Sequence, residues 1–79
     1  MVITMEKETA KELISFKLRH IQGEIQSILK KWDEDNTDDF IVKARRGILE
    51  NAEMDAITIR QLVADYNRLK KLLESVKSE

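Results

Sequence analysis

Two stretches of this chain carry apolar residues at alternating spacings of three and four, and this pattern constrains the fold more than any other feature. The twelve positions are Ile14, Leu18, Ile21, Ile25, Ile28 and Trp32, then Ile59, Leu62, Tyr66, Leu69, Leu73 and Val76. Such residues share one face only in a helix, and a second helix is needed to bury that face. We therefore expect an all-α fold in which the first and last helices pack as in a coiled coil.

The length of 79 residues allows a single helical domain, expected to span residues 1–79. A domain of this size buries a modest share of its surface, so association with a second chain is a common source of further stability. The sequence has no cysteine, which excludes disulfides and thiolate metal sites. Its 37% of charged residues and its lack of proline are typical of long helices with solvated faces rather than of disorder.

The charge balance gives no electrostatic preference for a polyanion. Fourteen basic and fifteen acidic side chains leave a net charge of −1, which exerts no long-range attraction on nucleic acid or anionic membranes. No apolar run approaches the roughly 20 residues of a membrane span. The first residues, MVITMEKE, lack the basic and apolar regions of a signal peptide. We expect a cytoplasmic protein that does not bind membranes.

Three helices are predicted, over about residues 5–32, 38–51 and 58–77. Thr4 or Thr9 is expected to cap the first helix, and Thr9 forms a capping box with the glutamate three residues later. The acidic segment that follows the first helix is expected to be a loop, in which Asn36 or Thr37 caps the second helix.

The link between the second and third helices decides the topology. Thr58 and Gln61 form a capping box, with Ile57 and Leu62 at the positions of a hydrophobic staple. We therefore predict a break between Asn51 and Thr58 and a small three-helix bundle. Gly47 then lies inside the second helix, at a cost of about 1 kcal/mol relative to alanine. The alternative is a long helical hairpin, whose second helix would run unbroken for roughly 60 Å.

The heptad register predicts which residues form the core. The central positions of the two stripes are Leu18, Ile25, Leu62 and Leu69. Truncation of any of them to alanine is expected to cost roughly 2–5 kcal/mol.

The first helix has a second face, opposite the stripe, that we interpret as a possible interface. It carries Leu13, Phe16, His20, Gly23 and Ser27. Two of these side chains are large and apolar, and the glycine and serine are small at a four-residue spacing, which lets another backbone come close. The alternative is that Val2 and Ile3 cover the two apolar side chains, or that they are ordinary exposed residues.

His20 is the only histidine, and Glu24 follows it by one helical turn. In this it resembles the phosphoacceptor of histidine kinase dimerisation domains and of phosphotransfer domains, which stands mid-helix on an exposed face. The motifs differ, because Ile21 takes the place of the acidic residue of the kinase motif. Gly23 comes one place too early for the phosphotransfer motif and lacks the lysine before it. A phosphotransfer-like hairpin is one alternative function.

The basic cluster of Lys43, Arg45 and Arg46 could contact phosphates, so a small regulator that binds nucleic acid is the other alternative. No aromatic residue is interleaved to stack on bases, which makes nucleic acid the less favoured partner. We expect these cations to pair instead within their own helix or with the acidic loop, through Asp38, Asp39 and Glu50.

The acidic segment at residues 33–39 matches a calcium loop only in part. Counted from Asp33, an EF-hand would need glycine at position 38 and glutamate at position 44, where the chain has Asp38 and Ala44. The sequence also shows no nucleophile with a base and no phosphate-binding glycine loop. We therefore predict a non-enzymatic helical interaction module without metal or cofactor. It is expected to form a homodimer or to bind a helical protein partner through apolar helix faces.

Overall fold

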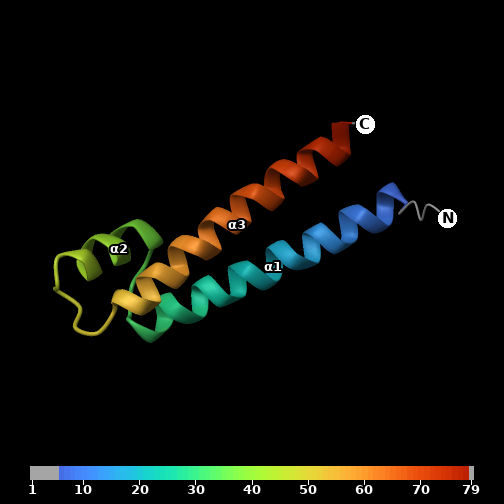
Figure 1. Cartoon of the computed structure of the whole chain (residues 1–79). Coiled ribbons are helices and arrows are strands. Elements are labelled where there is room, and N and C mark those ends of the chain that lie inside the picture. Colours follow the sequence, from blue (N-terminus) through green and yellow to red (C-terminus); the bar gives the residue numbers. More distant parts are fainter. Residues whose placement is uncertain (1–5, 79) are drawn as a thin grey trace.

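A computed structural model of the chain describes residues 6–78, which form three helices (Figure 1). They are α1 (Lys7–Lys31), α2 (Thr37–Arg45) and α3 (Glu53–Ser78). The two long helices lie side by side and antiparallel, and α2 packs across one end of the pair (Figure 1). The predicted small three-helix bundle, with its first and third helices packed together, is confirmed, and the single long helix from residue 38 is excluded.

The molecule is elongated, because α2 covers only one end of the long pair. Its principal extents are 53 × 23 × 16 Å and its radius of gyration is 16.0 Å. A compact domain of this length would have a radius of gyration of about 12 Å. We call the end that carries α2 the closed end. We call residues 7–22 of α1 and 66–78 of α3, which pack only on each other, the open half.

The first helix begins at Lys7, two residues before Thr9, so the predicted capping box at Thr9 does not start it. Glu6 occupies the cap position without a side-chain hydrogen bond to the helix, and Thr9 lies inside the first turns. The predicted start at residue 5 and the alternative cap Thr4 lie outside the described residues. The predicted cap of α2 is confirmed: the Asn36 side chain accepts a 2.8 Å hydrogen bond from the backbone N–H of Asp39.

The second helix is shorter than predicted, because Gly47 ends it. Gly47 has a φ of +75°, and its N–H donates to Ala44 O at 3.2 Å while Ile48 N–H donates to Lys43 O at 2.9 Å. This pair of bonds is a Schellman closure, in which a left-handed residue satisfies the last carbonyls of a helix. The helix therefore stops at Arg45, not at residue 51, and the prediction that Gly47 lies inside it is wrong.

The third helix begins earlier than predicted. Asn51 takes a φ of +62°, and the Ala52 carbonyl accepts from Ala56 N–H at 2.9 Å, so α3 begins at Glu53. Thr58 does not cap it. Its hydroxyl donates to Met54 O at 3.0 Å, as a threonine inside a helix does. The break therefore lies at residues 46–52, and the capping box at Thr58 was a wrong signal.

The core lies at the closed end, where three helices meet. Its fully enclosed side chains include Phe40, which stands 6.1 Å from Trp32 between ring centroids. The whole cluster consists of Leu29, Phe40, Ala44, Ala52, Ala56 and Ile59.

The predicted core residues only partly belong to this core. Leu18 is buried between α1 and α3, whereas Ile25, Leu62 and Leu69 are half-buried. The prediction assumed that a third helix would cover the full length of the seam. Because α2 has nine residues, only α1 and α3 cover the rest of the seam. Ile14, Leu18 and Ile21 of α1 are buried there, whereas Leu69 of α3 is half-buried.

Candidate functional site

The outer face predicted for α1 is open to solvent. Leu13 is 53% exposed and Phe16 is 64% exposed. A side chain added at Gly23 would meet nothing within 4 Å, and Ser27 is exposed. Val2 and Ile3, the alternative cover for this face, lie outside the described residues. The predicted interface residues therefore form a face that α2 and α3 leave free.

The third helix adds a large apolar side chain at the same level. Two hydrogen bonds set the antiparallel register: Gln22 Nε2 donates to Tyr66 Oη at 3.1 Å, and Trp32 Nε1 donates to Asp55 Oδ2 at 2.8 Å. In this register position 72 stands beside position 16. Leu72 is 50% exposed. Sequence reasoning missed it, because its role depends on the register between two distant helices.

Leu13 and Leu72 lie on the same broad side of the helix pair. Each precedes a seam residue by one position and is therefore turned from the seam by about 100°. In an antiparallel pair, residues that stand one position before a seam residue along their own chain lie on the same side of the pair in both helices. Positions that follow a seam residue lie on the other side, which is the side of α2: Leu29 packs on Phe40 there. Phe16 stands two positions from the seam residues Ile14 and Leu18, so it lies on the outer side of α1, next to Leu13. We call Leu13, Phe16 and Leu72 the open apolar face; none of the three lies on the side of α2.

Charged pairs border the open apolar face toward the middle of the molecule. His20 Nε2 lies 2.7 Å from Glu24 Oε1, and Arg68 contacts Asp65 at 3.1 Å. His20 and Asp65 each precede a seam residue and so share the side of the open apolar face. An apolar centre with a charged border is the usual composition of a protein interface.

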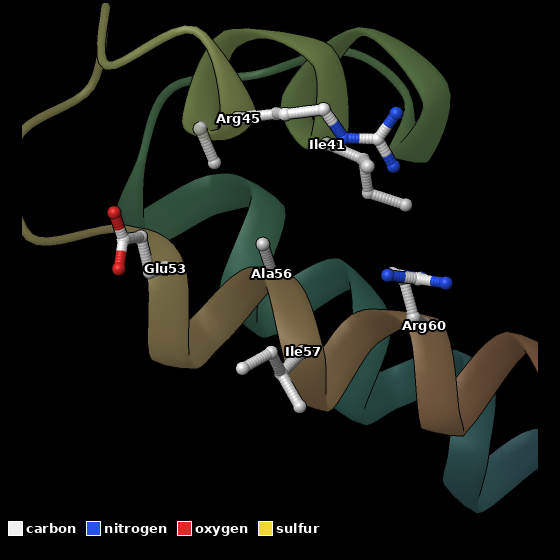
Figure 2. A pocket seen from close by; sticks show the side chains of 7 residues that line it. Ile41, Arg45, Glu53, Ala56, Ile57 and Arg60 are labelled. Carbon is white, nitrogen blue, oxygen red and sulfur yellow. The ribbon is translucent and has the colours of Figure 1, made fainter.

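The predicted phosphate cluster is not a cluster of free cations. Lys43 Nζ lies 2.9 and 3.0 Å from the two carboxylate oxygens of Glu34, so it pairs with the acidic loop, which is one of the two predicted arrangements. The hydrogen bond that Lys43 donates to Glu34 is the main reason that the pKa of Lys43 is raised above its usual 10.5. Arg45 lines a groove between α2 and α3 (Figure 2), and Arg46 is the exposed C-cap of α2. The three side chains thus have different environments.

The acidic loop is used to hold α1 and α2 together. The Glu34 side chain is 7% exposed in its pair with Lys43, and Asp39 accepts from the Asn36 amide at 3.0 Å. Within residues 6–78 no three acidic or histidine side chains gather in a way that could hold a metal ion.

A polar contact at the closed end was missed by sequence reasoning. Asp55 Oδ2 accepts from Trp32 Nε1 at 2.8 Å and from Lys31 Nζ at 3.0 Å. These bonds, the indole first, hold the pKa of Asp55 below its usual 3.8. The lysine ammonium also stands 5.5 Å from the indole ring centroid. Asp55 thus occupies a seam position, four residues before the stripe residue Ile59.

No protein-family model, no curated protein and no solved structure matches this chain. In residues 6–78 no helix combines the length and the apolar character required to cross a membrane.

Proposed function

We propose that this chain is a non-enzymatic helical interaction module that self-associates through its open apolar face. The observation that carries the proposal is the position of this face. Three large apolar side chains from two helices, each at least half exposed, lie in the half of the molecule where α2 does not reach. Exposed apolar residues are ordinary when they stand singly, whereas residues gathered on one side are typical of an interface.

The exposed area of the chain supports a dimer. The accessible surface is 6284 Å². The general relation between mass and area gives about 4,900 Å² for a compact monomer of this mass, so the chain exposes about 1,400 Å² more. Each partner in a standard interface buries about 800 Å². The excess is large enough for one such interface.

The chemistry of the face favours a second copy as the occupant. The border carries both signs of charge, through the His20–Glu24 pair on α1 and the Asp65–Arg68 pair on α3. In a two-fold symmetric dimer the same patch meets itself, so unlike charges can oppose each other around an apolar centre. Two helical hairpins packed in this way form a four-helix bundle, which would cover the half-buried seam of each chain.

Sedimentation velocity across micromolar concentrations tests the proposal. We expect wild type to be a dimer and the variants Phe16→Glu and Leu72→Glu to be monomeric, because each would bury an unpaired charge. Met54→Glu is the matched control: Met54 is 73% exposed but belongs to the closed end, so its variant should remain dimeric. Circular dichroism checks that all variants keep their helices.

Three results would refute the proposal. Wild type could be monomeric throughout the range, both face variants could remain dimeric, or Met54→Glu could dissociate the dimer as Phe16→Glu does. The variant Gly23→Leu provides a further test of the interface. Its side chain would enter open space in the monomer, so only a dimer whose interface includes Gly23 should weaken.

The alternative functions stay predictions. The pairing of Lys43 with Glu34 weakens the case for a nucleic-acid site at the basic cluster. The contact between His20 and Glu24 is compatible with phosphotransfer, and an acid-labile phosphate on His20 would support that alternative. We keep the cytoplasm as the proposed location, since a chain without cysteine is suited to a reducing compartment.

A further inference from the structure

A groove runs between α2 and α3 at the closed end (Figure 2). Its volume is about 290 Å³, and its main lining residues are Ile41, Ala44, Arg45, Ala56, Ile57 and Arg60. The floor is apolar, and Ile57 is half exposed in it. Ala44 and Ala56 in its floor belong to the core, and the proposed dimer contact does not use this groove.

The groove continues along α3 beyond the end of α2. Ile57 and Arg60 also line the next hollow, together with Gln61 and Ala64. From Glu53 to Ala64 the axis of α3 rises by about 16 Å, which is three turns of a helix. Alanines in the lining let another helix backbone come close, as small residues do wherever helices pack tightly. The length and the small floor residues fit a short helix laid into the groove.

Two arginines give the groove a charge that the chain itself does not neutralise. Arg45 comes from α2 and Arg60 from α3, and Figure 2 shows both guanidinium groups toward the same end of the groove, with Glu53 toward the other. Within residues 6–78 neither arginine has an ion pair or a side-chain hydrogen bond, whereas Lys31, Lys43 and Arg68 all have carboxylate partners. A guanidinium pairs best with a carboxylate, which it can bind through two parallel hydrogen bonds.

We propose that this groove binds an acidic amphipathic helix of a partner protein. Aliphatic side chains of that helix, three or four residues apart, pack on Ile41 and Ile57. An aspartate or glutamate one to two turns further along lies between Arg45 and Arg60. Glu53 at the opposite end disfavours a second acid there, so the partner helix binds in one direction.

The observations favour a helix over a nucleic acid. A nucleic-acid site needs a row of cations or an aromatic platform for the bases. Here an apolar floor separates two arginines from a glutamate, and the aromatic side chains Trp32 and Phe40 lie within or against the core. Because the groove lies between α2 and the first part of α3 and the open apolar face lies in the open half, a dimer could bind two partner helices.

A phage-displayed library of 16-residue helix-forming peptides, selected on the full-length chain, tests this inference. We expect the selected peptides to share two aliphatic residues at a spacing of three or four, with an acidic residue one or two turns away. Fluorescence anisotropy of the best peptide should show at least tenfold weaker binding to the double variant Arg45→Glu, Arg60→Glu. The control Arg19→Glu, Lys70→Glu changes the charge equally at two exposed positions outside the groove and outside the charged border of the open apolar face, and it should bind as wild type does.

A charge exchange makes the test independent of folding defects. The same peptide with lysine in place of its acidic residue should bind the Arg45→Glu, Arg60→Glu variant better than it binds wild type. Amide chemical shifts of the labelled protein should change at Ala44, Ala56 and Ile57 when the peptide is added.

Several results would overturn the inference. The selection could enrich no peptide above background, or enrich peptides without acidic residues. The double arginine variant could bind as tightly as wild type, or the chemical shifts could change at Leu13 and Phe16 instead. A 20-nucleotide RNA that binds wild type, and is lost in the double arginine variant but not in its control, would assign the groove to phosphate rather than to a helix.

Discussion

Replacement of Asp55 by alanine should lower the free energy of unfolding by more than is usual for a partly exposed surface carboxylate. The carboxylate accepts bonds from the Trp32 indole at 2.8 Å and from Lys31 at 3.0 Å, and its side chain is 26% exposed. A hydrogen bond to a charged group is worth about 1.5–3 kcal/mol when buried, and the partial exposure places this one near 1.5–2 kcal/mol. The outer contact with the 65% exposed Lys31 adds less than about 1 kcal/mol.

The pH dependence of this loss identifies its origin. The folded pKa of Asp55 lies below the ordinary value of 3.8, so the carboxylate stabilises the fold at any pH above 3.8. This contribution disappears as the pH falls through the folded pKa, because the folded state then has to take up a proton. The difference in unfolding free energy between wild type and Asp55→Ala should be constant from pH 5 to 7 and shrink below pH 3.8.

Urea unfolding followed by circular dichroism measures both effects, at one protein concentration because self-association would add its own stability. Asp55→Asn separates the two bonds, since its amide oxygen still accepts from the indole but carries no charge. It should retain part of the stability and lose the pH dependence. A loss below about 0.3 kcal/mol in Asp55→Ala, or a difference that persists unchanged at pH 3, would refute this account of the Trp32 contact.

Further predictions concern the backbone and the core, each measured by urea unfolding. Gly47→Ala should cost about 1 kcal/mol or more, because φ is +75° there, and an unchanged midpoint would contradict the Schellman closure. Asp33→Gly should stabilise the fold by several tenths of a kcal/mol, because Asp33 has a φ of +55° at the end of α1; a loss would mean that its side chain is needed. Phe40→Ala should cost about 3–5 kcal/mol and the half-buried Leu69→Ala roughly half of that, so equal losses would argue against the difference in burial between the two positions.

The helical class and the pairing of the long helices were predictable, because the apolar spacing of each stripe depends only on local sequence. The end of α2 could also have been predicted from the sequence. Lys43 and Arg45 in the last turn followed by Gly47 form a common pattern for the end of a helix. The interpretation of Gly47 as a weak interior position ignored this pattern and carried α2 six residues too far.

The capping box at Thr58 misled for a different reason. A threonine followed three residues later by a glutamine also occurs inside helices, where the hydroxyl bonds to a preceding carbonyl, as Thr58 does to Met54 O. The true start of α3 depends on Asn51, whose left-handed conformation leaves a weak trace in the sequence.

The site residues that sequence reasoning missed are those defined by register between helices. Leu72 joins the open apolar face only because α3 runs antiparallel to α1 with position 72 beside position 16. Arg45 and Arg60 converge only because α2 folds back over α3. Such neighbours lie 15 or more residues apart in the chain, and no local pattern places them together. The exposed residues of α1 were predictable, since one helix suffices to define its outer face.

The uneven cover that α2 gives to the long pair has a consequence for how the molecule opens. A segment that packs on one neighbour is released at less cost than a segment that packs on two. The start of α1 and the end of α3, which form the open half, should therefore separate first (Figure 1). Amide hydrogens of the open half should then exchange when α1 and α3 separate partially, while those around Phe40 exchange only when the whole chain unfolds. A partner that clamps the free ends would slow the first set selectively, so exchange rates can report association without any label.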